Sequence, residues 1–526
     1  MIKNSKIVIA IVLCLVMLCG VTGCAGSAPE PAETDETEPA SVAASKEADI
    51  VVVGGGGAGM CAAVEAASTG ASVIVLEKAA AIGGATNFAE GVFAVESVLQ
   101  QELGITTNKK EILKTEYEFQ NYKVNTKLWE ETVDMSAENI SWLLDLGVEF
   151  ATVTSPCAGE KTWHVYAPYG EYNHGAALIQ VLKGHAEDLG VEILVSTPGT
   201  ELIMDGDHIS GVKATQADGS ELVINSKAVI LATGGLGANQ EMLLDLTNLD
   251  VSQISFRGIG TATGDGIRMA REVGAFPDNN ITVCMLAVTM DNKSVFSEMS
   301  EAGAMEPTNL WVNQDALRYV PEDILFHQTR VANALLMQDA TYSIMDSASI
   351  DRLVNEGCIS GYGLYVLAGQ KLTGLEDEIA KAIADGDPGV FKADTLEELA
   401  EQMGVNPDTL VETVEEYNTY CDNGEDLQYE KDPQYLREVR TGPFYAFRLY
   451  GSALNTMGGL KINVDCEVLD QDKQPINGLY AAGMDVSGYA GETYGIVAPG
   501  SDQGIAVATG RIAAISAVEY CAALSS

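Results

Sequence analysis

The chain has 526 residues and carries 75 acidic against 30 basic side chains, a formal net charge of −45. This surplus of negative charge repels phosphate backbones and anionic lipid headgroups. We therefore expect neither a nucleic-acid-binding protein nor a folded body that lies on a membrane surface. The length allows two domains with large hydrophobic cores.

Residues 1–23 are predicted to be an export signal rather than part of the fold. Lys3 and Lys6 form a basic segment, and the apolar run 7–19 is too short to cross a membrane comfortably. The sequence Val-Thr-Gly-Cys, ending at Cys24, is similar to a bacterial lipobox, in which Cys24 receives the lipid. Cleavage at an ordinary signal-peptidase site is the alternative. The pattern predicts an extracytoplasmic lipoprotein signal peptide and a protein held to the cell membrane only by its N-terminal lipid.

Residues 24–47 are rich in Ala, Glu, Pro, Ser and Thr and show no apolar periodicity, which predicts a disordered tether. The globular body is expected from about Ala48 onward. The ten cysteines of the chain are widely spaced and form no C-x-x-C pair. This spacing argues against an iron–sulfur cluster, c-type haem or another metal centre in this chain.

The body opens with a predicted strand–turn–helix–strand unit. An apolar strand over 49–53 precedes the glycine-rich turn, and a helical pattern over 58–68 follows it. A second apolar strand, 71–76, ends at Glu77. This order is typical of a dinucleotide-binding βαβ unit, in which an acid lies about 20 residues after the glycines.

The turn itself fits G-x-G-x-x-G at Gly54, Gly56 and Gly59. Gly54 permits the tight turn, Gly56 lets backbone amides approach a pyrophosphate, and Gly59 lets helix and strand pack closely. The helix N-terminus then faces the phosphates, and Glu77 is placed to accept hydrogen bonds from ribose hydroxyls. An ordinary glycine-rich βα turn is the alternative.

The rest of the body alternates short predicted elements with glycine-rich turns. The expected elements are a loop over 83–91, helices over 106–146 and 175–189, strands over 191–196, 202–205, 211–216 and 228–232, and a closing helix over 504–520. Between them, residues 281–441 lose the glycine-rich turns and become acidic and helical in composition. We interpret this stretch as an inserted domain.

Seven landmarks occur in a common order. They are VVVGGGGAGMCAA (51–63), GGATNFAEG (83–91), ATGG (232–235), ATGDG (262–266), NTMGG (455–459), GLYAAGMD (478–485) and GRIAA (510–514). With these, the chain resembles the flavoprotein subunits of fumarate reductase and succinate dehydrogenase, and in particular the exported fumarate and urocanate reductases. The resemblance covers nearly all of residues 48–520.

The resemblance implies an α/β fold, with a Rossmann-type FAD-binding domain in two segments, 48–280 and 442–526. A mobile α+β capping domain, 281–441, is inserted between them. Membrane-bound relatives link the flavin to a histidine, and Ala85 occupies that position here. Because alanine has no nucleophile, the FAD is expected to be non-covalent.

The motifs and the resemblance together predict a set of FAD contacts. They are Gly54, Gly56, Ala58, Gly59, Glu77, Lys78, Gly84, Ala85, Thr86, Gly91, Thr233, Gly234, Asp265, Gly483, Asp485 and Ser501.

The resemblance also suggests a proton donor on the capping domain. In the family this donor is an arginine after a V-N-x-x-G-x-R-F segment; here that segment ends Arg318-Tyr319, and Arg330 is the best match to the donor. An arginine normally stays charged, so it can act as an acid only beside anionic groups or in a relay. A surface or domain-interface ion pair is the alternative for Arg330, and Arg318 is expected to be structural.

The predicted substrate ligands differ from those of dicarboxylate reductases. Asn455 replaces a histidine before Thr456, and the loop 485–507 has no arginine or lysine but contains Tyr489 and Tyr494. A dicarboxylate needs charged partners to offset its desolvation. The pattern therefore favours a monocarboxylate or a neutral enone with a bulky side chain.

The leading hypothesis is an exported FAD-dependent reductase of an activated C=C bond, serving anaerobic respiration with electrons from a separate FMN-bearing protein or cytochrome. The first alternative is a dehydrogenase that desaturates a ketone-bearing ring, as ketosteroid dehydrogenases do. The second is a non-catalytic binding lipoprotein of the same fold.

Overall fold

The computed structural model describes residues 44–155, 160–247, 249–290, 297–361, 366–491, 494–495 and 497–526. Residues 44–526 form one compact unit. The predicted signal peptide, Cys24 and most of the predicted tether lie outside the described residues.

A large sheet forms the first layer. Its order is β16-β17-β8-β9-β1-β2-β6, with β7 paired to β8. The strands are β1 (Ala44–Val53), β2 (Val73–Leu76), β6 (Glu192–Leu194), β7 (Gly199–Asp205), β8 (His208–Thr215), β9 (Glu221–Leu231), β16 (Glu467–Leu469) and β17 (Pro475–Ala481). The run β6-β2-β1-β9-β17 is parallel. Parallel strands of this kind are covered on both faces, which explains the unbroken apolar run at the end of β1.

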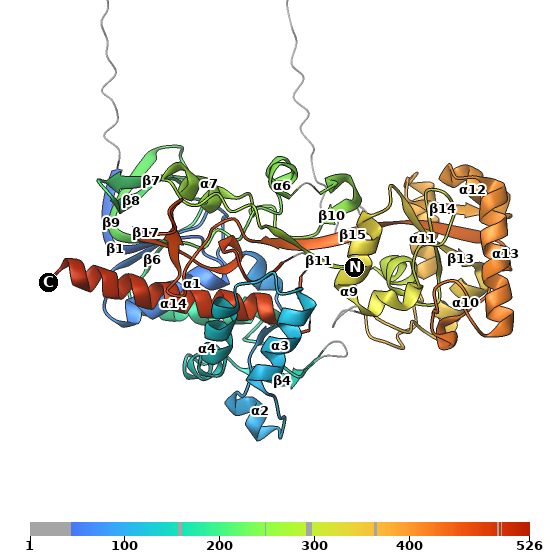
Figure 1. Cartoon of the computed structure of the whole chain (residues 1–526), viewed down its shortest axis with the longest axis horizontal. Helices are drawn as coiled ribbons and strands as arrows, with labels where there is room; N and C mark the ends of the chain where they lie inside the picture. Colours follow the sequence, from blue (N-terminus) through green and yellow to red (C-terminus); the bar gives the residue numbers. More distant parts are fainter. Residues whose placement is uncertain are drawn as a thin grey trace, which may run out of the picture. The chain divides into compact units, whose positions relative to one another are not determined.

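Helices cover this sheet, and two of them pack closely against each other (Figure 1). Those on this side of the molecule are α1 (Gly57–Ser68), α2 (Val98–Glu102), α3 (Lys109–Phe119), α4 (Thr126–Asp145), α5 (His174–Asp188), α6 (Gln240–Thr247), α7 (Asp265–Glu272) and α14 (Ser501–Leu524). A Cβ on Gly510 of α14 would lie 2.3 Å from the Ala58 carbonyl oxygen of α1, so glycine is needed at this crossing. Within the described part of the chain, α14 alone is long and apolar enough to cross a membrane, but most of it is buried in the fold.

A second sheet organises the region predicted as the capping domain. Its strands are β10 (Ile254–Phe256), β11 (Thr282–Thr289), β12 (Leu310–Asn313), β13 (Thr341–Asp346), β14 (Val390–Ala393) and β15 (Phe444–Met457). Its helices are α8 (Glu298–Ser300), α9 (Gln328–Leu336), α10 (Ser347–Asn355), α11 (Leu375–Ala384), α12 (Leu396–Met403) and α13 (Pro407–Asn423). Helix α13 begins after an Asn406 side-chain cap, with Pro407 in its first turn, and ends at left-handed Gly424. A small third sheet joins β3 (Gly91–Phe93), β5 (Trp163–Tyr166) and β4 (Phe150–Thr154).

Strand β15 connects the two regions. Residues 444–449 pair with β13, whereas 450–457 pair with β11, and the segment 451–453 pairs with β10. Figure 1 shows β15 as the long strand that runs from the neighbourhood of β13 to that of β11.

Three boundaries differ from the sequence prediction. The predicted tether ended at residue 47, but residues 44–47 already belong to β1, where they pair with β9. The predicted boundary at 441–442 precedes β15, which belongs to the second sheet along its whole length. Likewise β10, expected in the first FAD segment, pairs with β15. Backbone pairing extends elements past the points where composition changes.

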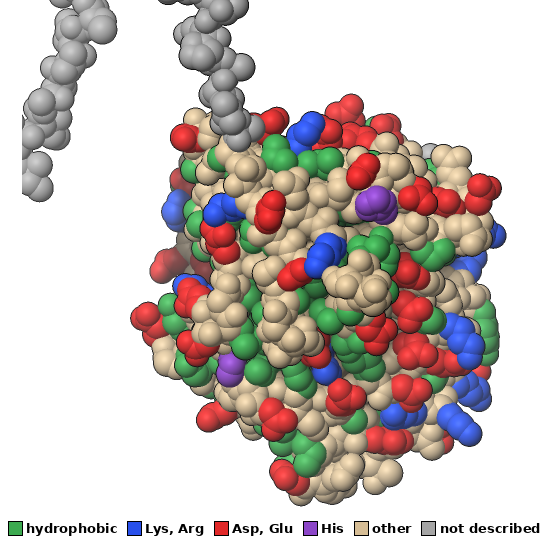
Figure 2. All heavy atoms as spheres, turned by 90° about the vertical axis from the view of Figure 1, so that its left-hand side faces the viewer, with side chains coloured by type: hydrophobic (Ala, Val, Ile, Leu, Met, Phe, Trp, Pro, Cys, Tyr) green, Lys and Arg blue, Asp and Glu red, His purple; other side chains and the backbone are tan. Residues whose placement is uncertain are grey.

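The surface carries the negative charge in a dispersed form. On the face shown in Figure 2, acidic side chains spread over most of the area and basic ones lie singly among them. Such a mixed surface keeps an acidic protein soluble without forming one continuous patch of charge.

Candidate active site

A cavity of about 790 Å³, part of it open to solvent, lies at the carboxyl edge of the parallel strands. Its walls come from the turns that follow β1, β2, β9 and β17, together with the start of β7 and one residue of α14. Open α/β sheets bind nucleotide ligands at this edge, because the carboxyl ends of neighbouring strands meet there.

Most of the predicted FAD contacts line this cavity. They are Gly54, Gly56, Ala58, Glu77, Lys78, Gly84, Ala85, Thr86, Thr233, Gly234, Asp265 and Gly483. Sequence reasoning missed several apolar or small wall residues, among them Pro198, Gly199, Ile259, Ala482 and Met484. Gly199 lies between two predicted strands and Met484 lies within the landmark 478–485, but neither residue type carries a signal of its own.

The three motif glycines have different tasks in the structure. Gly54 has φ +113°, and a Cβ there would lie 2.1 Å from the Ala232 carbonyl oxygen. A Cβ on Gly59 would lie 1.9 Å from the Gly54 carbonyl oxygen, so Gly59 serves helix–strand packing rather than the cavity wall. Gly56 has no atom closer than 4.0 Å to such a Cβ, and it lines the cavity. Gly56 thus leaves room for a ligand, whereas the other two leave room for backbone.

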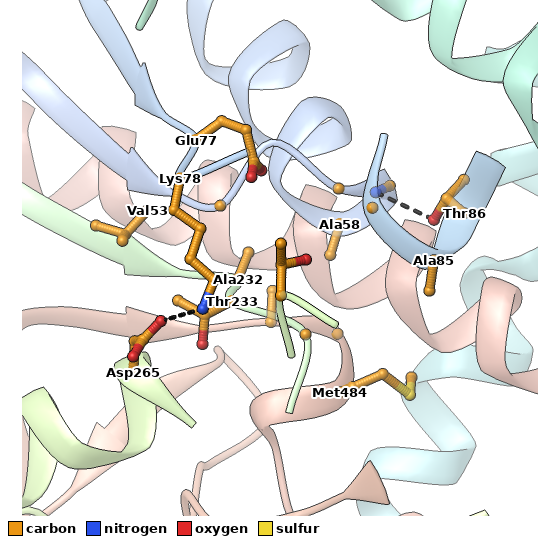
Figure 3. A pocket seen from close by; sticks show the side chains of 18 of the residues that line it. Val53, Ala58, Glu77, Lys78, Ala85, Thr86, Ala232, Thr233, Asp265 and Met484 are labelled. Carbon is orange, nitrogen blue, oxygen red and sulfur yellow. Dashed lines mark hydrogen bonds and ion pairs between the residues drawn. The ribbon is translucent and has the colours of Figure 1, made fainter. Parts of the chain in front are cut away.

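Glu77 lies toward one end of the cavity and Met484 toward the other (Figure 3). The Glu77 carboxylate accepts hydrogen bonds from the Gly55 amide at 2.9 Å and the Ala79 amide at 2.7 Å. These bonds fix an acceptor where a ribose diol would need one. Figure 3 also shows Lys78 reaching Asp265, with Nζ 2.6 Å from Oδ2. Asp265 is therefore held by an ion pair in the wall.

The wall near Ala85 is organised by Thr86. Its Oγ1 accepts a hydrogen bond from the Gly57 amide at 3.1 Å and donates one to Gln503 Oε1 at 3.1 Å. The other end of that amide, Gln503 Nε2, is buried and has no partner. A Cβ on Gly57 would lie 2.9 Å from this nitrogen. An orphaned donor beside a glycine is the kind of environment that an acceptor-rich ligand satisfies.

These features fit FAD. Glu77 would hold the ribose, the glycine turn and the N-terminus of α1 would hold the pyrophosphate, and Gln503 would donate to a carbonyl or hydroxyl of the cofactor. Among the described residues that line the cavity there is no histidine, cysteine or tyrosine. Ala85 itself is in the wall.

Four predicted FAD contacts do not reach the wall. Gly59 packs α1 onto β1, as described above. Gly91 begins β3, where a Cβ would lie 2.4 Å from the His164 carbonyl oxygen. Ser501 begins α14 and donates a hydrogen bond to the Gly495 carbonyl at 3.3 Å. Asp485 is fully buried beneath the wall.

Asp485 instead supports the wall from behind. Its carboxylate accepts hydrogen bonds from the Thr233 amide at 2.6 Å and the Gly235 amide at 2.8 Å. Burial raises the pKa of Asp485, and these hydrogen bonds oppose that shift. The Asp485 carboxylate joins the turns after β9 and β17. It therefore fixes the shape of the cavity wall but does not itself line the cavity.

Two of the four predicted substrate ligands are structural. The Tyr489 hydroxyl pairs with Thr132 Oγ1 at 2.9 Å, and its ring packs edge-on against Trp129 in the core. Thr456 Oγ1 accepts a hydrogen bond from the Leu236 amide at 2.8 Å, and Thr456 is fully buried. The sequence of a glycine-rich loop does not determine whether a tyrosine ring in it points into the site or into the core.

The other two, Asn455 and Tyr494, meet two acids that sequence reasoning missed. Asn455 Nδ2 donates to Asp502 Oδ2 at 2.9 Å and lies 3.2 Å from Met484 Sδ in the cavity wall. Burial raises the pKa of Asp502 to about 6, against the opposing effects of Asn455 and Tyr494. Burial also raises the pKa of Glu116 on α3 to about 7, and the nearby charge of Asp502 adds to the shift.

Neither acid belongs to the landmarks. Asp502 lies in the first turn of the closing helix and within the segment 485–507 that lacks lysine and arginine, and this position is the one signal that the sequence offers. Glu116 is one of several acids along α3, and nothing in the sequence separates it from the exposed ones.

The predicted proton donor, Arg330, lies in α9 and is exposed. Its guanidinium carbon is 5.5 Å from the centroid of the Phe119 ring at the end of α3. Arg318, expected to be structural, is buried and forms bidentate ion pairs with Glu322 and Asp426, at 2.9–3.0 Å.

The sequence profile of the family described as "FAD binding domain" matches residues 49–494. The chain belongs to this family. It is an FAD-dependent oxidoreductase acting on CH–CH groups. The predicted cofactor, the α/β fold class and the resemblance to fumarate reductase flavoproteins are confirmed.

Three members or neighbours of this FAD-binding family are informative. A vinyl phenol reductase of Lactiplantibacillus plantarum is 40% identical over 458 residues, covering 86% of this chain and 92% of that protein. An NADH:fumarate oxidoreductase of Klebsiella pneumoniae is 30% identical over 423 residues, which cover 80% of this chain but 42% of that longer protein. The crystal structure of a 3-ketosteroid Δ4-(5α)-dehydrogenase from Rhodococcus jostii RHA1 has a TM-score of 0.67 and 25% identity, covering 92% of this chain and 98% of that one.

Proposed function

We propose that this FAD-binding family member is an exported, lipid-anchored reductase of an activated C=C bond that takes its electrons from a separate FMN-bearing protein or cytochrome in anaerobic respiration. The observation that carries the proposal is the pairing of a complete FAD cavity with an acidic, tyrosine-bearing cluster, Asn455–Asp502–Tyr494–Glu116, beside it. A double bond needs a hydride at one carbon and a proton at its neighbour, and FAD supplies the hydride when it is bound.

The substrate is proposed to be neutral or weakly acidic. Within the described parts of the chain, neither Asp502 nor Glu116 has a lysine or arginine partner. A dicarboxylate would meet two acids there instead of the cations that it needs, and its desolvation would be uncompensated. The relationship to a vinyl phenol reductase at 40% identity supports a vinyl group conjugated to a hydroxylated ring, alongside enones and aromatic enoates.

Arg330 is proposed as the group that delivers the proton, on the strength of the family pattern. Its place on α9, against Phe119 of α3, supports a position where the predicted capping region faces the FAD-binding region. Because a guanidinium holds its proton tightly, Arg330 can donate only if a neighbouring acid returns a proton to it.

A ketosteroid-type dehydrogenase remains the second candidate. The similarity to the Rhodococcus jostii dehydrogenase along nearly its whole length favours it. Tyr494, which lies near Asp502 and Ser501, would then assist the removal of a proton from the substrate. A binding lipoprotein of the same fold is the third, and the intact FAD cavity argues against it.

One anaerobic experiment separates these candidates. The purified protein is assayed with reduced methyl viologen against 4-vinylphenol, 4-hydroxycinnamate, acrylate, fumarate and an enone steroid, and in reverse with saturated ketosteroids and an artificial acceptor. We expect viologen oxidation with 4-vinylphenol or another neutral alkene and little with fumarate. Turnover in the reverse direction alone would support the dehydrogenase, and no turnover with FAD present would support the binding protein.

A further inference from the structure

Two acids from distant parts of the sequence meet beside the FAD cavity. Glu116 on α3 is completely buried, and Asp502 lies in the first turn of α14. Gln120 Nε2 donates to Glu116 Oε1 at 2.8 Å, and Asn455 Nδ2 donates to Asp502 Oδ2 at 2.9 Å. Each carboxyl group is therefore held by a side-chain amide, and Tyr494 also stabilises the ionised form of Asp502.

The second oxygen of each acid is left without a partner. Glu116 Oε2 and Asp502 Oδ1 are both buried and accept no hydrogen bond. A buried ionised carboxylate with an unsatisfied oxygen is costly, and a proton on that oxygen removes the cost. Burial raises the pKa of both acids into the range of about 6 to 7, and the charge of Asp502 further disfavours ionisation of Glu116.

The groups around the pair do not neutralise it. Cys284 is buried and Tyr494 partly buried beside Asp502, and desolvation raises the pKa of both well above their ordinary values, so both stay uncharged. Arg330 of α9 is exposed and contacts Phe119, three residues after Glu116. The first turn of α14 favours the ionised form of Asp502, so Glu116 is the acid that keeps its proton at the higher pH.

We propose that Glu116 and Asp502 form a proton-storing pair that reloads the proton-delivering group during reduction of the substrate double bond. This role rests on the proposed reductase function. In each turnover the two electrons arrive with the hydride, and one proton leaves the pair for the neighbouring carbon by way of the delivering group. The pair becomes more negative by one charge and regains a proton from solvent. Both residues are positioning residues, since they act through another group.

The first test detects the stored proton directly, as a protonated carboxyl group. Infrared spectra of the FAD-loaded protein, recorded without substrate between about pH 5 and pH 9, should contain a carboxylic acid C=O band that shifts in D₂O and disappears as the pH rises through about 6 to 7. Asp502→Asn and Glu116→Gln should each alter this band. Glu301→Gln is the matched control, because Glu301 is also buried, with a pKa of about 7 and an unpartnered oxygen, but lies in the other region.

Substrate-driven reoxidation of the reduced flavin is the second test. The wild-type rate should fall above about pH 7, whereas Glu116→Gln and Asp502→Asn should be about 10-fold or more slower and lose that alkaline limb, with normal FAD content and no loss of melting temperature. Glu301→Gln should keep it. The proposal is overturned if the wild-type protein has no pH-dependent acid band, or if the Glu116→Gln, Asp502→Asn double variant keeps the wild-type pH profile. An intact band with no reoxidation by any alkene would instead reject the reductase function.

Discussion

Asn455 connects the FAD cavity to Asp502: its Nδ2 is 2.9 Å from Asp502 Oδ2 and 3.2 Å from the sulfur of Met484 in the cavity wall. The contact joins β15, the central strand of the second sheet, to the first turn of the closing helix α14. A structural change in β15 or in the first turn of α14 would therefore alter the packing at the edge of the cofactor site.

FAD should be released by acid precipitation, because Ala85 replaces the linking histidine and the described wall residues include no histidine, cysteine or tyrosine. The supernatant should carry the flavin absorption, and the pellet should be colourless. A flavin that remains with the precipitated chain after washing would show a covalent bond.

Two glycine variants should separate the cofactor from the fold. Gly56→Val should fold but fail to load FAD, because its side chain would point into the cavity with no protein atom in its way. Gly54→Ala should fail to fold stably, because its φ is +113° and its Cβ would collide with backbone. Circular dichroism and flavin content measure the two effects. Normal FAD loading of Gly56→Val would contradict the proposed pyrophosphate position.

Glu116→Gln should make stability less sensitive to pH. The pKa of Glu116 in the fold is about 7 and its ordinary value is 4.5. The folded state binds the Glu116 proton more tightly than the unfolded state does. The stabilisation that this proton gives to the fold is therefore fully present below the ordinary pKa and is lost as the pH rises through about 7. The variant should gain about 1–3 kcal/mol relative to wild type at pH 8 and little at pH 4. Denaturant titrations at both pH values measure this, and an equal effect at both would indicate a purely steric role.

Replacing Arg318 should lower stability, whereas replacing Arg330 should lower the rate of flavin reoxidation. Arg318→Ala leaves the buried carboxylates Glu322 and Asp426, with Lys431, without their guanidinium and should cost about 3–5 kcal/mol. Arg330→Ala removes an exposed side chain, so it should melt normally and retain FAD but lose about 10²-fold or more of its reoxidation rate. If Arg330→Ala turns over normally while Tyr494→Phe is inactive, the proton is delivered by the tyrosine.

NADH alone should not support turnover. The chain covers 42% of the NADH:fumarate oxidoreductase, so the activity of that whole protein does not transfer to this chain. We expect viologen-dependent activity without NADH-dependent activity, measured side by side on the same preparation. Rapid oxidation of NADH by the purified chain would show that it accepts electrons directly.

The sequence predicted the FAD-binding region well because its constraints are local. Gly54, Gly56 and Glu77 stand at fixed spacings, and their tasks follow from backbone geometry. The substrate side was predicted poorly because it is assembled from α3, β15 and α14, which are far apart in the chain. Tyr489 was placed in the site but turns into the core, and Glu116 was missed because an acid on a helix is usually exposed.

The most direct test of the reductase account is substrate-driven reoxidation of the flavin. The FAD-loaded protein is reduced with one equivalent of dithionite under anaerobic conditions and mixed in a stopped-flow instrument with 4-vinylphenol, with 4-ethylphenol as the saturated control. The account predicts that the absorption of oxidised flavin returns with 4-vinylphenol, that 4-ethylphenol accumulates in equal amount, and that the control is silent. If the flavin stays reduced with 4-vinylphenol and with every other unsaturated acid or enone tested, the chain is not a reductase of activated double bonds.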